Sequence, residues 1–357
     1  MKVYIKFIIY NFLKSLLYVS SIIFCLILIL NLLTEFEFFR EINVKYYFPI
    51  YLSLLNSPSL MFEMFPFIFL ISTQSCFLNL MRNDQIQTLK YSGLKNIRII
   101  LILLSASLIT GILISSLFYN LSSNLKNIYL ELKNNYTSDN KYLAVITNNG
   151  LWIKDNINNK INIINASKIN DKFLTNVSIT ELDTDFNVKK HIESTQIDIT
   201  KNEWIILNPT VYSGSEKRQI KSMKFKSNFD YERIQSLFSN LSSLSILELF
   251  ELKNNYNILN LSTTEIILQL QKIFSYPIYL CLMTLLASII MFYLKKNQNS
   301  TLKISFGLFL SVVIYYLNNF LYVLGKTEKI NIILSVWAPL LILMMINSMY
   351  ILKINEK

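Results

Sequence analysis

Few residues in this sequence have the types and spacings that carry out chemistry on a nucleotide. A phosphate-binding loop needs closely spaced glycines followed by Gly-Lys-Ser/Thr, and that triplet does not occur. The glycines are too far apart to form such a loop: Gly93, Gly111, Gly150, Gly214, Gly307 and Gly325. We therefore expect this chain to bind no nucleotide in that manner.

Metal sites and catalytic centres are also predicted to be absent. His191 is the only histidine, whereas a catalytic metal usually has two or three converging ligands. A Ser–His pair stays open, although no Gly-x-Ser-x-Gly turn frames a serine. The three cysteines, Cys25, Cys76 and Cys281, lie in apolar segments and are interpreted as packing residues. The sequence thus predicts no enzyme, no catalytic residue, no metal and no cofactor.

The composition is that of a membrane-embedded protein. Of 357 residues, 52% are hydrophobic and 16% are charged, and the mean hydropathy is +0.38. Charged residues thin out in windows of about twenty residues, the length of a helix that crosses roughly 30 Å of hydrocarbon. The windows are Ser15–Leu33, Leu60–Met81, Ile99–Phe118, Ile273–Leu294, Ile304–Leu324 and Ile330–Leu352. The first is too long for a signal-peptide core, so we expect it to be a retained helix.

The net charge is +11, and the Lys and Arg residues that produce it flank these windows instead of forming one basic face. This distribution argues against nucleic-acid binding. If the N-terminus is cytoplasmic, the cytoplasmic pieces hold twelve Lys and Arg residues against Asp84 and Glu356. The two short loops on the other side hold as many glutamates as basic residues. We therefore expect a multi-pass inner-membrane protein with both termini in the cytoplasm.

A polar segment, 120–271, separates the third and fourth windows. It contains short β-branched or aromatic runs between turn residues: Tyr142–Thr147, Leu151–Lys154, Lys160–Asn165, Phe173–Leu182, Ile192–Ile199, Glu203–Leu207 and Ile220–Phe225. This pattern predicts an antiparallel sandwich or jelly roll. From Tyr231 to Leu252 the apolar spacing becomes helical.

The predicted fold class is an α-helical membrane protein with six transmembrane helices and an all-β, jelly-roll-like periplasmic domain between helices 3 and 4. Residues 1–119 hold helices 1–3, with a short cytoplasmic helix at about 82–96. Residues 120–271 form the periplasmic domain and its helical return segment. Residues 272–357 hold helices 4–6.

Two short pieces have competing interpretations. Glu63 is predicted to be an acid at a helix N-terminus, where the macrodipole favours it, and the alternative is a charge in a transport pathway. The loop 82–96 is either a plain basic loop or a short helix that docks into a soluble partner. As a helix, it would turn Ile86, Leu89 and Tyr91 toward apolar surface and leave Arg82 in solvent.

Several short segments have a characteristic order and spacing along nearly the whole chain. They are Ser57-Pro58, Glu63-Met64-Phe65-Pro66, Gln85–Gly93, Asn149–Asp155, Trp204, Ile304–Gly307 and Trp337-Ala338-Pro339. In these segments the sequence resembles the lipopolysaccharide-export permeases of the LptF/LptG family, and LptG more closely. The loop segment Gln85–Gly93 is similar to the family's coupling helix, which ends in Ser-Gly.

The resemblance implies a role as the non-catalytic permease subunit of an ATP-driven exporter. Such a subunit extracts lipopolysaccharide from the inner membrane and passes it through its periplasmic jelly roll toward the outer membrane. The implied partners are an LptB-like ATPase dimer, an LptF-like paralogous permease, an LptC-like bitopic protein and lipopolysaccharide itself.

The resemblance also assigns site residues. Those implied for coupling to the ATPase are Asp84, Gln85, Ile86, Leu89, Ser92 and Gly93. Gln85 stands where the family has glutamate, and a neutral hydrogen bond is roughly half as strong as a charge-assisted one. Those implied for lipid binding are Arg40, Lys45 and Trp152.

Two other functions compete with this interpretation. One is a membrane-anchored sensor or structural protein with a ligand-binding outer domain, although an anchor needs fewer than six spans. The other is a lipoprotein-release permease, but such a permease has its large outer domain after the first span, and here the domain follows the third.

Overall fold

A computed structural model describes residues 3–40, 42, 44–134, 136, 151–157, 160–170, 172–183, 188–201, 203–213, 216–227, 229, 231, 240–258, 262–293 and 300–355. For residues 134, 151–154, 156–157, 160, 168–170, 216, 258, 300 and 352–355, it describes the backbone alone. The chain divides into two compact units. The helical unit comprises Met1–Leu132, Ser242–Ile246 and Thr264–Lys357, and the β unit comprises Lys133–Leu241 and Leu247–Thr263.

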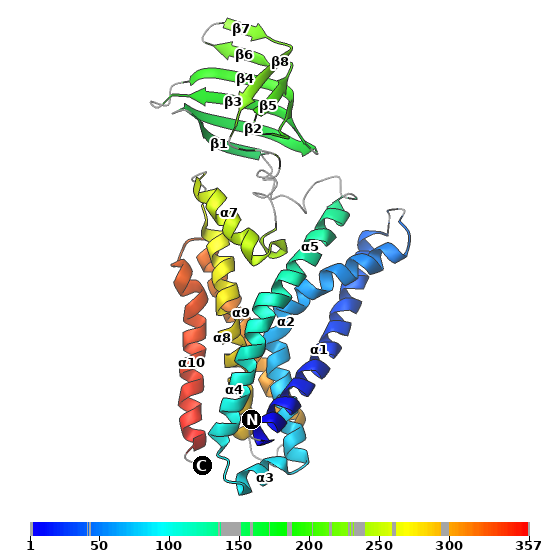
Figure 1. Cartoon of the computed structure of the whole chain (residues 1–357), viewed down its shortest axis with the longest axis vertical. Helices are drawn as coiled ribbons and strands as arrows, with labels where there is room; N and C mark the ends of the chain where they lie inside the picture. The colour runs from blue at the N-terminus through cyan, green and yellow to red at the C-terminus, as the bar shows by residue number, and fades with distance from the viewer. Residues whose placement is uncertain are drawn as a thin grey trace. The chain divides into compact units, whose positions relative to one another are not determined.

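The helical unit is built from long helices joined by short turns (Figure 1). The described helices of the chain, in sequence order, are α1 (Val3–Phe38), α2 (Tyr47–Arg82), α3 (Gln85–Tyr91), α4 (Asn96–Leu113), the π-helical turn η1 (Ile114–Phe118), α5 (Tyr119–Asn134), the 3₁₀ turn η2 (Leu241–Ser243), α7 (Ile246–Ile258), α8 (Thr264–Tyr293), α9 (Ser300–Lys326) and α10 (Ile332–Asn355). Of these, most of α7 belongs to the β unit. In the described part of the chain, six helical stretches are long and apolar enough to cross a membrane, α4, η1 and α5 together forming the third. This confirms the predicted six apolar helices.

Several of these helices are longer than their apolar windows, the second and third most clearly. The second begins at Tyr47, well before Leu60, and the third continues through η1 and α5 as far as Asn134. Several serine and asparagine side chains of this extension bond to carbonyls one turn back; Asn120, for example, donates to the carbonyl of Ser116 at 2.7 Å. Hydropathy alone misses such a continuation, because it measures apolarity and not helix formation.

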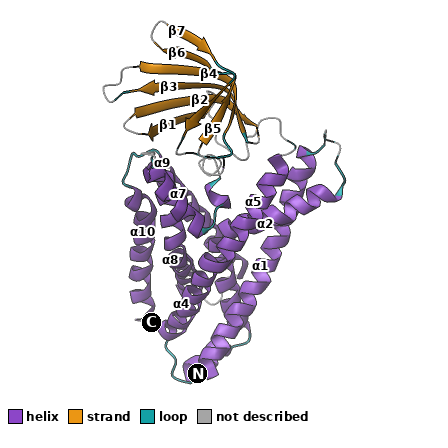
Figure 2. Cartoon of the chain, turned by 45° about the horizontal axis from the view of Figure 1, so that its top comes forward, coloured by secondary structure: helices purple, strands orange, loops and turns teal. Residues whose placement is uncertain are grey.

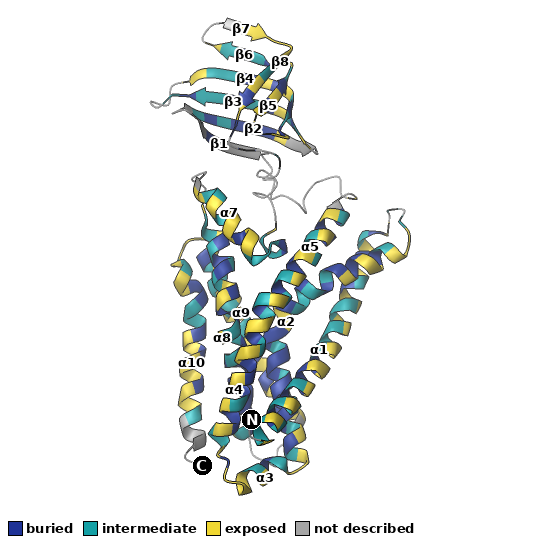
Figure 3. Ribbon diagram, in the orientation of Figure 1, coloured by how far each residue is buried: buried dark blue, intermediate teal, exposed yellow. Residues whose placement is uncertain are grey.

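Helix α8 is the centre of the helical unit, and α1 and α9 are its periphery. Of the most apolar stretch of each helix, 72% of residues are buried in α8 but only 17% in α1 and 11% in α9 (Figure 3). The exposed side chains of α9 include Phe309, Tyr316 and Phe320. Apolar surface of this extent fits contact with lipid or with helices of another chain.

Two glycines bring α9 close to its neighbours. A Cβ at Gly307 would lie 2.2 Å from Nε2 of Gln74 in α2, and a Cβ at Gly325 would lie 2.3 Å from Oγ of Ser335 in α10. The buried Gln74 amide also donates to the carbonyl of Lys303 at 2.9 Å. Helix α9 is thus held against α2 near one end and against α10 near the other.

The β unit is one curved antiparallel sheet (Figure 2). Its strands are β1 (Leu151–Ile157), β2 (Lys160–Asn170), β3 (Phe173–Leu182), β4 (Val188–Asp198), β5 (Glu203–Leu207), β6 (Thr210–Ser213), β7 (Glu216–Gln219) and β8 (Ser222–Lys226). The order is β1-β2-β3-β4-β5-β8, and the hairpin β6–β7 pairs with β4. The all-β character and its place between the third and fourth apolar helices are as the sequence predicted.

A side-chain hydrogen bond joins the two ends of this strand order. The hydroxyl of Ser227, which directly follows β8, donates to the buried carboxylate of Asp155 in β1 at 2.8 Å. Because β1 and β8 lie at opposite ends of the strand order, the bond shows that the sheet curls until its edges approach each other. The unit is therefore a strongly curved sheet whose two edges are linked by a side-chain hydrogen bond.

The inside of the curved sheet is filled by the protein's own apolar side chains. Its fully buried members include Ile164, Leu174, Ile179 and Trp204. The indole Nε1 of Trp204 donates to the carbonyl of Phe229 at 2.6 Å, so this large side chain buries no unsatisfied polar atom. The alternating burial along β3 and β5 is the pattern of a sheet with one covered face.

The predicted strands correspond to those described, with two differences. The run Tyr142–Thr147 lies outside the described residues. The hairpin β6–β7 was not predicted, because four-residue strands are too short to show a clear alternation of apolar and polar residues. In the helical return segment α7 begins at Ile246, and it buries Leu249 and Leu252 while Leu247 is exposed.

Outside the membrane-spanning helices, a local turn fixes one carboxylate. The hydroxyl and the backbone amide of Thr200 both donate to Asp198 at the end of β4, at 2.6 and 2.9 Å. These bonds lower the pKa of Asp198 below its ordinary value, because they stabilise the ionised form.

Candidate functional site

The short helix α3, between α2 and α4, has a defined beginning and end. Asp84 precedes it in a left-handed conformation, φ 51°. At its end, Gly93 has φ +82°, the amide of Gly93 donates to Lys90, and the amide of Leu94 donates to Leu89. This pair of bonds is a Schellman motif, in which a left-handed glycine satisfies the last carbonyls of a helix. The Ser-Gly at this place therefore has a structural reason.

The faces of α3 differ in burial. Ile86 is buried against the helical unit and Leu89 is half-buried, whereas Tyr91 is 89% exposed. Tyr91 was predicted to meet apolar surface together with Ile86 and Leu89. Within this chain it does not share their side of α3, and its contact with a partner stays a prediction. Five residues after Ile86, Tyr91 is rotated about 140° around the helix axis, so the two side chains cannot share a face.

A groove of about 610 Å³ lies between α3 and the beginning of α1. It is lined by Val3, Tyr4, Phe7, Gln85, Thr88, Leu89, Ser92, Gly93, Leu94 and Arg98. Of the predicted coupling residues, the structure brings Gln85, Leu89, Ser92 and Gly93 together here, while Ile86 points inward. The contribution of α1 was not predicted; its amphipathic start was the only signal for it.

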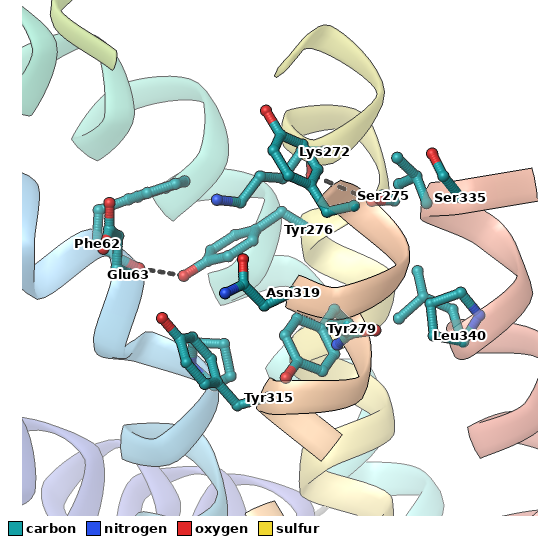
Figure 4. A pocket seen from close by; sticks show the side chains of 15 residues that line it. Phe62, Glu63, Lys272, Ser275, Tyr276, Tyr279, Tyr315, Asn319, Ser335 and Leu340 are labelled. Carbon is teal, nitrogen blue, oxygen red and sulfur yellow. Dashed lines mark hydrogen bonds between the residues drawn. The ribbon is translucent and has the colours of Figure 1, made fainter. Parts of the chain in front are cut away.

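A second cavity, of about 250 Å³, lies inside the helical unit among α2, α8, α9 and α10 (Figure 4). It is lined by Phe62, Glu63, Pro66, Lys272, Ser275, Tyr276, Tyr279, Tyr315, Asn318, Asn319, Tyr322, Ser335, Val336, Pro339 and Leu340. Below we call it the helix-bundle pocket. Polar and ionisable groups are rare between apolar helices, and where they gather they usually face a cavity used for transport.

Opposite charges stand at the exposed part of this pocket. Glu63 of α2 and Lys272 of α8 both line it and both are exposed. The amine of Lys272 lies over the ring of Tyr322, 5.5 Å from its centroid. Tyrosine hydroxyls and the Asn319 amide complete a wall that can donate and accept hydrogen bonds. Such a lining suits a ligand that is partly polar and partly apolar.

The structure corrects the first interpretation of Glu63. Helix α2 begins at Tyr47 and has no acidic residue in its first turn. Glu63 is therefore far inside the helix, where the N-terminal dipole has no effect. Glu63 instead lines the helix-bundle pocket, and the alternative, a charge in a transport pathway, stays a prediction.

The predicted lipid-binding residues belong to different units. Arg40 and Lys45 are exposed in the turn between α1 and α2, and the Lys45 amine lies 5.8 Å from the ring centroid of Tyr47. Trp152 belongs to the β unit, where its backbone pairs with Asn165 of β2. Its side chain lies outside the described part of the structure.

The single histidine is part of a surface cluster on the sheet. Its Nδ1 is 2.9 Å from the Thr180 hydroxyl and its Nε2 is 3.4 Å from the Glu193 carboxylate. Among the described residues, no group of three His, Cys, Asp or Glu side chains is arranged to hold a metal ion.

Together, the six apolar helices, the polar cavity between them and the all-β unit are the features of a multi-pass membrane protein with a large β unit. The model of the protein family described as "Lipopolysaccharide export system permease LptF/LptG" matches residues 6–353, essentially the whole chain. The chain therefore belongs to the LptF/LptG family of lipopolysaccharide export permeases. No curated protein matches it at a significant level.

Membership of this family agrees with the resemblance found in the sequence, and it does not distinguish LptG from LptF. No observation favours the competing interpretations as a sensor or a lipoprotein-release permease.

Proposed function

We propose that this chain is the non-catalytic permease subunit of an ATP-driven exporter that extracts lipopolysaccharide from the inner membrane. The observation that supports this most is the family match over residues 6–353. The absence of a Gly-Lys-Ser/Thr triplet from the sequence is consistent with ATP hydrolysis by a separate subunit.

The ATPase, an LptB-like dimer, docks at α3 and its groove. The groove combines the half-buried Leu89 with the polar Gln85 and Ser92, and Arg98 adds a positive charge at its wall. The Schellman motif holds α3 in one orientation, so a push on its exposed face is transmitted to α2 and α4. Asp84 and Ile86 act by placing this helix, Asp84 at its start and Ile86 on its buried face.

The other partners are an LptF-like permease and an LptC-like bitopic protein. The sparsely buried helices α1 and α9 offer the apolar surface that a second permease would cover. The first described residues of α1, the end of α10 and α3 lie at the same end of the helical unit (Figure 1). We place this end in the cytoplasm, because the short loops and chain ends predicted to be cytoplasmic contain the excess of Lys and Arg.

The lipid passes from the helical unit to the β unit. Arg40 and Lys45, exposed beyond the end of α1, are suited to contact lipid phosphates. The helix-bundle pocket, in the same unit, offers a mixed polar and apolar surface. The apolar interior of the β unit, to which Trp152 belongs by sequence, receives the acyl chains, since each buried CH₂ contributes roughly 0.8 kcal/mol.

The experiment that tests the coupling role changes Leu89 to Asp in the full-length chain. A carboxylate in the groove should weaken co-purification of the ATPase after mild solubilisation and reduce ATP-dependent lipopolysaccharide release, since burying an unpaired charge is costly. Gln87→Asp is the matched control: it adds the same charge on the exposed side of α3, outside the groove. Normal assembly and release with Leu89→Asp, or no ATPase bound to the native chain, would contradict the proposal.

A further inference from the structure

Pro66 interrupts the backbone hydrogen bonds of α2 at the wall of the helix-bundle pocket. Proline has no amide hydrogen, so the carbonyl four residues earlier, that of Phe62, has no helical donor. Between membrane-spanning helices, a freed carbonyl must be satisfied by a neighbouring group. Helix α2 bends along its course (Figure 1), as expected of a helix with two internal prolines, Pro58 and Pro66.

Tyr276 of α8 provides the missing donor. Its hydroxyl donates to the carbonyl of Phe62 (Figure 4). Its ring also stacks on the Phe62 ring, with centroids 4.4 Å apart and an interplanar angle of 19°. Both side chains are buried. One tyrosine therefore holds the interrupted part of α2 both by packing and by a hydrogen bond to the atom that Pro66 leaves free.

The same contact determines where Glu63 lies. Glu63 directly follows Phe62, so the Phe62 peptide sets the start of its side chain. Lys272 lies one turn before Tyr276 on the same face of α8. A fixed Phe62–Tyr276 contact thus holds the carboxylate of α2 and the amine of α8 on the same pocket.

We propose that Tyr276 is a positioning residue of the transport pathway: its hydroxyl holds the proline bend of α2 and so keeps Glu63 at the helix-bundle pocket. The consequence for lipid release rests on the proposed function. The bend itself does not, and it is measured separately.

The test is Tyr276→Phe, which keeps the stacked ring and removes only the hydroxyl. The matched control is Tyr279→Phe. Tyr279 lines the same pocket on the same helix, but its hydroxyl lies beside the Asn318 side chain of α9, whereas the Phe62 carbonyl of α2 accepts from Tyr276.

Pulsed EPR on the full-length chain in lipid nanodiscs, with its native cysteines replaced, measures the bend as a distance distribution between two spin labels. Spin labels replace Tyr51 and Arg82, which are exposed on either side of the bend in α2. A straight helix would separate these backbone positions by roughly 46 Å. We expect Tyr276→Phe to broaden the distance distribution and Tyr279→Phe to leave it unchanged. An unchanged distribution with Tyr276→Phe, or equal broadening with both variants, overturns the proposal.

Testing Tyr276→Phe in a Pro66→Ala variant distinguishes the effect of the Tyr276 hydrogen bond from the effect of its ring packing. Pro66→Ala restores an amide that can donate to the Phe62 carbonyl, so Tyr276→Phe should then have no further effect on the distance distribution. The same broadening in the Pro66→Ala background would show that the hydroxyl acts in another way and would overturn the proposal.

Lipopolysaccharide release by the same variants distinguishes the two possible failures. If the native chain releases no lipopolysaccharide while the distances change as expected, the proposed function fails and the role of Tyr276 in the bend stands. If release is normal and the distances do not respond to Tyr276→Phe, only the role of Tyr276 fails.

Discussion

At the scale of single residues, Gly93 shows why a short helix needs a particular residue at its end. Its φ of +82° is in the left-handed region, and no atom lies within 4 Å of the place where a Cβ would be. The requirement is therefore conformational and not steric. A seven-residue helix such as α3 has little stability of its own, so its cap contributes a large share.

We predict that Gly93→Ala weakens this cap by about 1 kcal/mol, the cost of placing a Cβ in the left-handed region. Amide exchange in α3, measured by mass spectrometry on the full-length chain, should become roughly fivefold faster. Gly93→Asn should have a smaller effect, because asparagine tolerates this conformation. Equal protection in the native chain and Gly93→Ala would show that the Schellman motif does not hold α3.

At the scale of elements, α9 is the least-buried apolar helix of the described structure, and its glycines explain how it stays attached. Near its beginning, Gly307 leaves room for the Gln74 side chain, whose amide bonds to the Lys303 carbonyl. The oxygen of that amide, Oε1, is buried and has no hydrogen-bond partner among the described residues. The contact is therefore specific, but the hydrogen-bonding capacity of the Gln74 amide is only partly used.

We predict that Gly307→Ala destabilises the helical unit by roughly 1–2 kcal/mol, because the new methyl group displaces Gln74 and breaks its buried hydrogen bond. Thermal unfolding in detergent measures the loss. In a Gln74→Ala background, where the space is free, Gly307→Ala should add little further destabilisation. Additive effects of the two substitutions would exclude a direct contact.

At the scale of the whole molecule, the first question is whether the β unit lies in the lipid path. Its interior is filled by its own side chains in this structure, so lipid chains could enter only if the sheet opens. The bond between Asp155 and Ser227 joins the edges that would separate.

We predict that a photo-crosslinker at Met223, which packs against the interior cluster, captures lipopolysaccharide during ATP-driven release. The control position is Ile205, which is 42% exposed and lies on the other side of the sheet from its buried neighbour Ile206. Crosslinks of equal yield at both positions, or none at Met223 in an active complex, would remove the interior from the path.

The second whole-molecule question is orientation. We predict that a reporter fused near Lys201, in the turn between β4 and β5, is inaccessible from the cytosol and reachable from the periplasm. Cytosolic labelling of this position would reverse the topology, and the lipid-export interpretation would fail with it.

The sequence by itself determined the number of apolar helices, the place of the β unit between the third and fourth, and the family. Hydrophobic length and strand alternation depend on residues close in the chain, so they can be read locally. The glycine at the end of α3 was recognisable for the same reason, because a cap is formed by neighbouring residues. The predicted limits at 119 and 271, and the roles of Arg40, Lys45 and Trp152, stay predictions.

Only the tertiary structure decided which distant residues meet. The sequence placed Glu63 at a helix start, but the helix begins far earlier, and Glu63 faces a cavity with Lys272, more than two hundred positions away. Likewise, Pro66 in the sequence predicts that the Phe62 carbonyl lacks its helical donor, but the residues near Pro66 do not indicate that Tyr276 donates to it. Contacts between helices depend on how the helices pack, and a linear pattern does not contain that information.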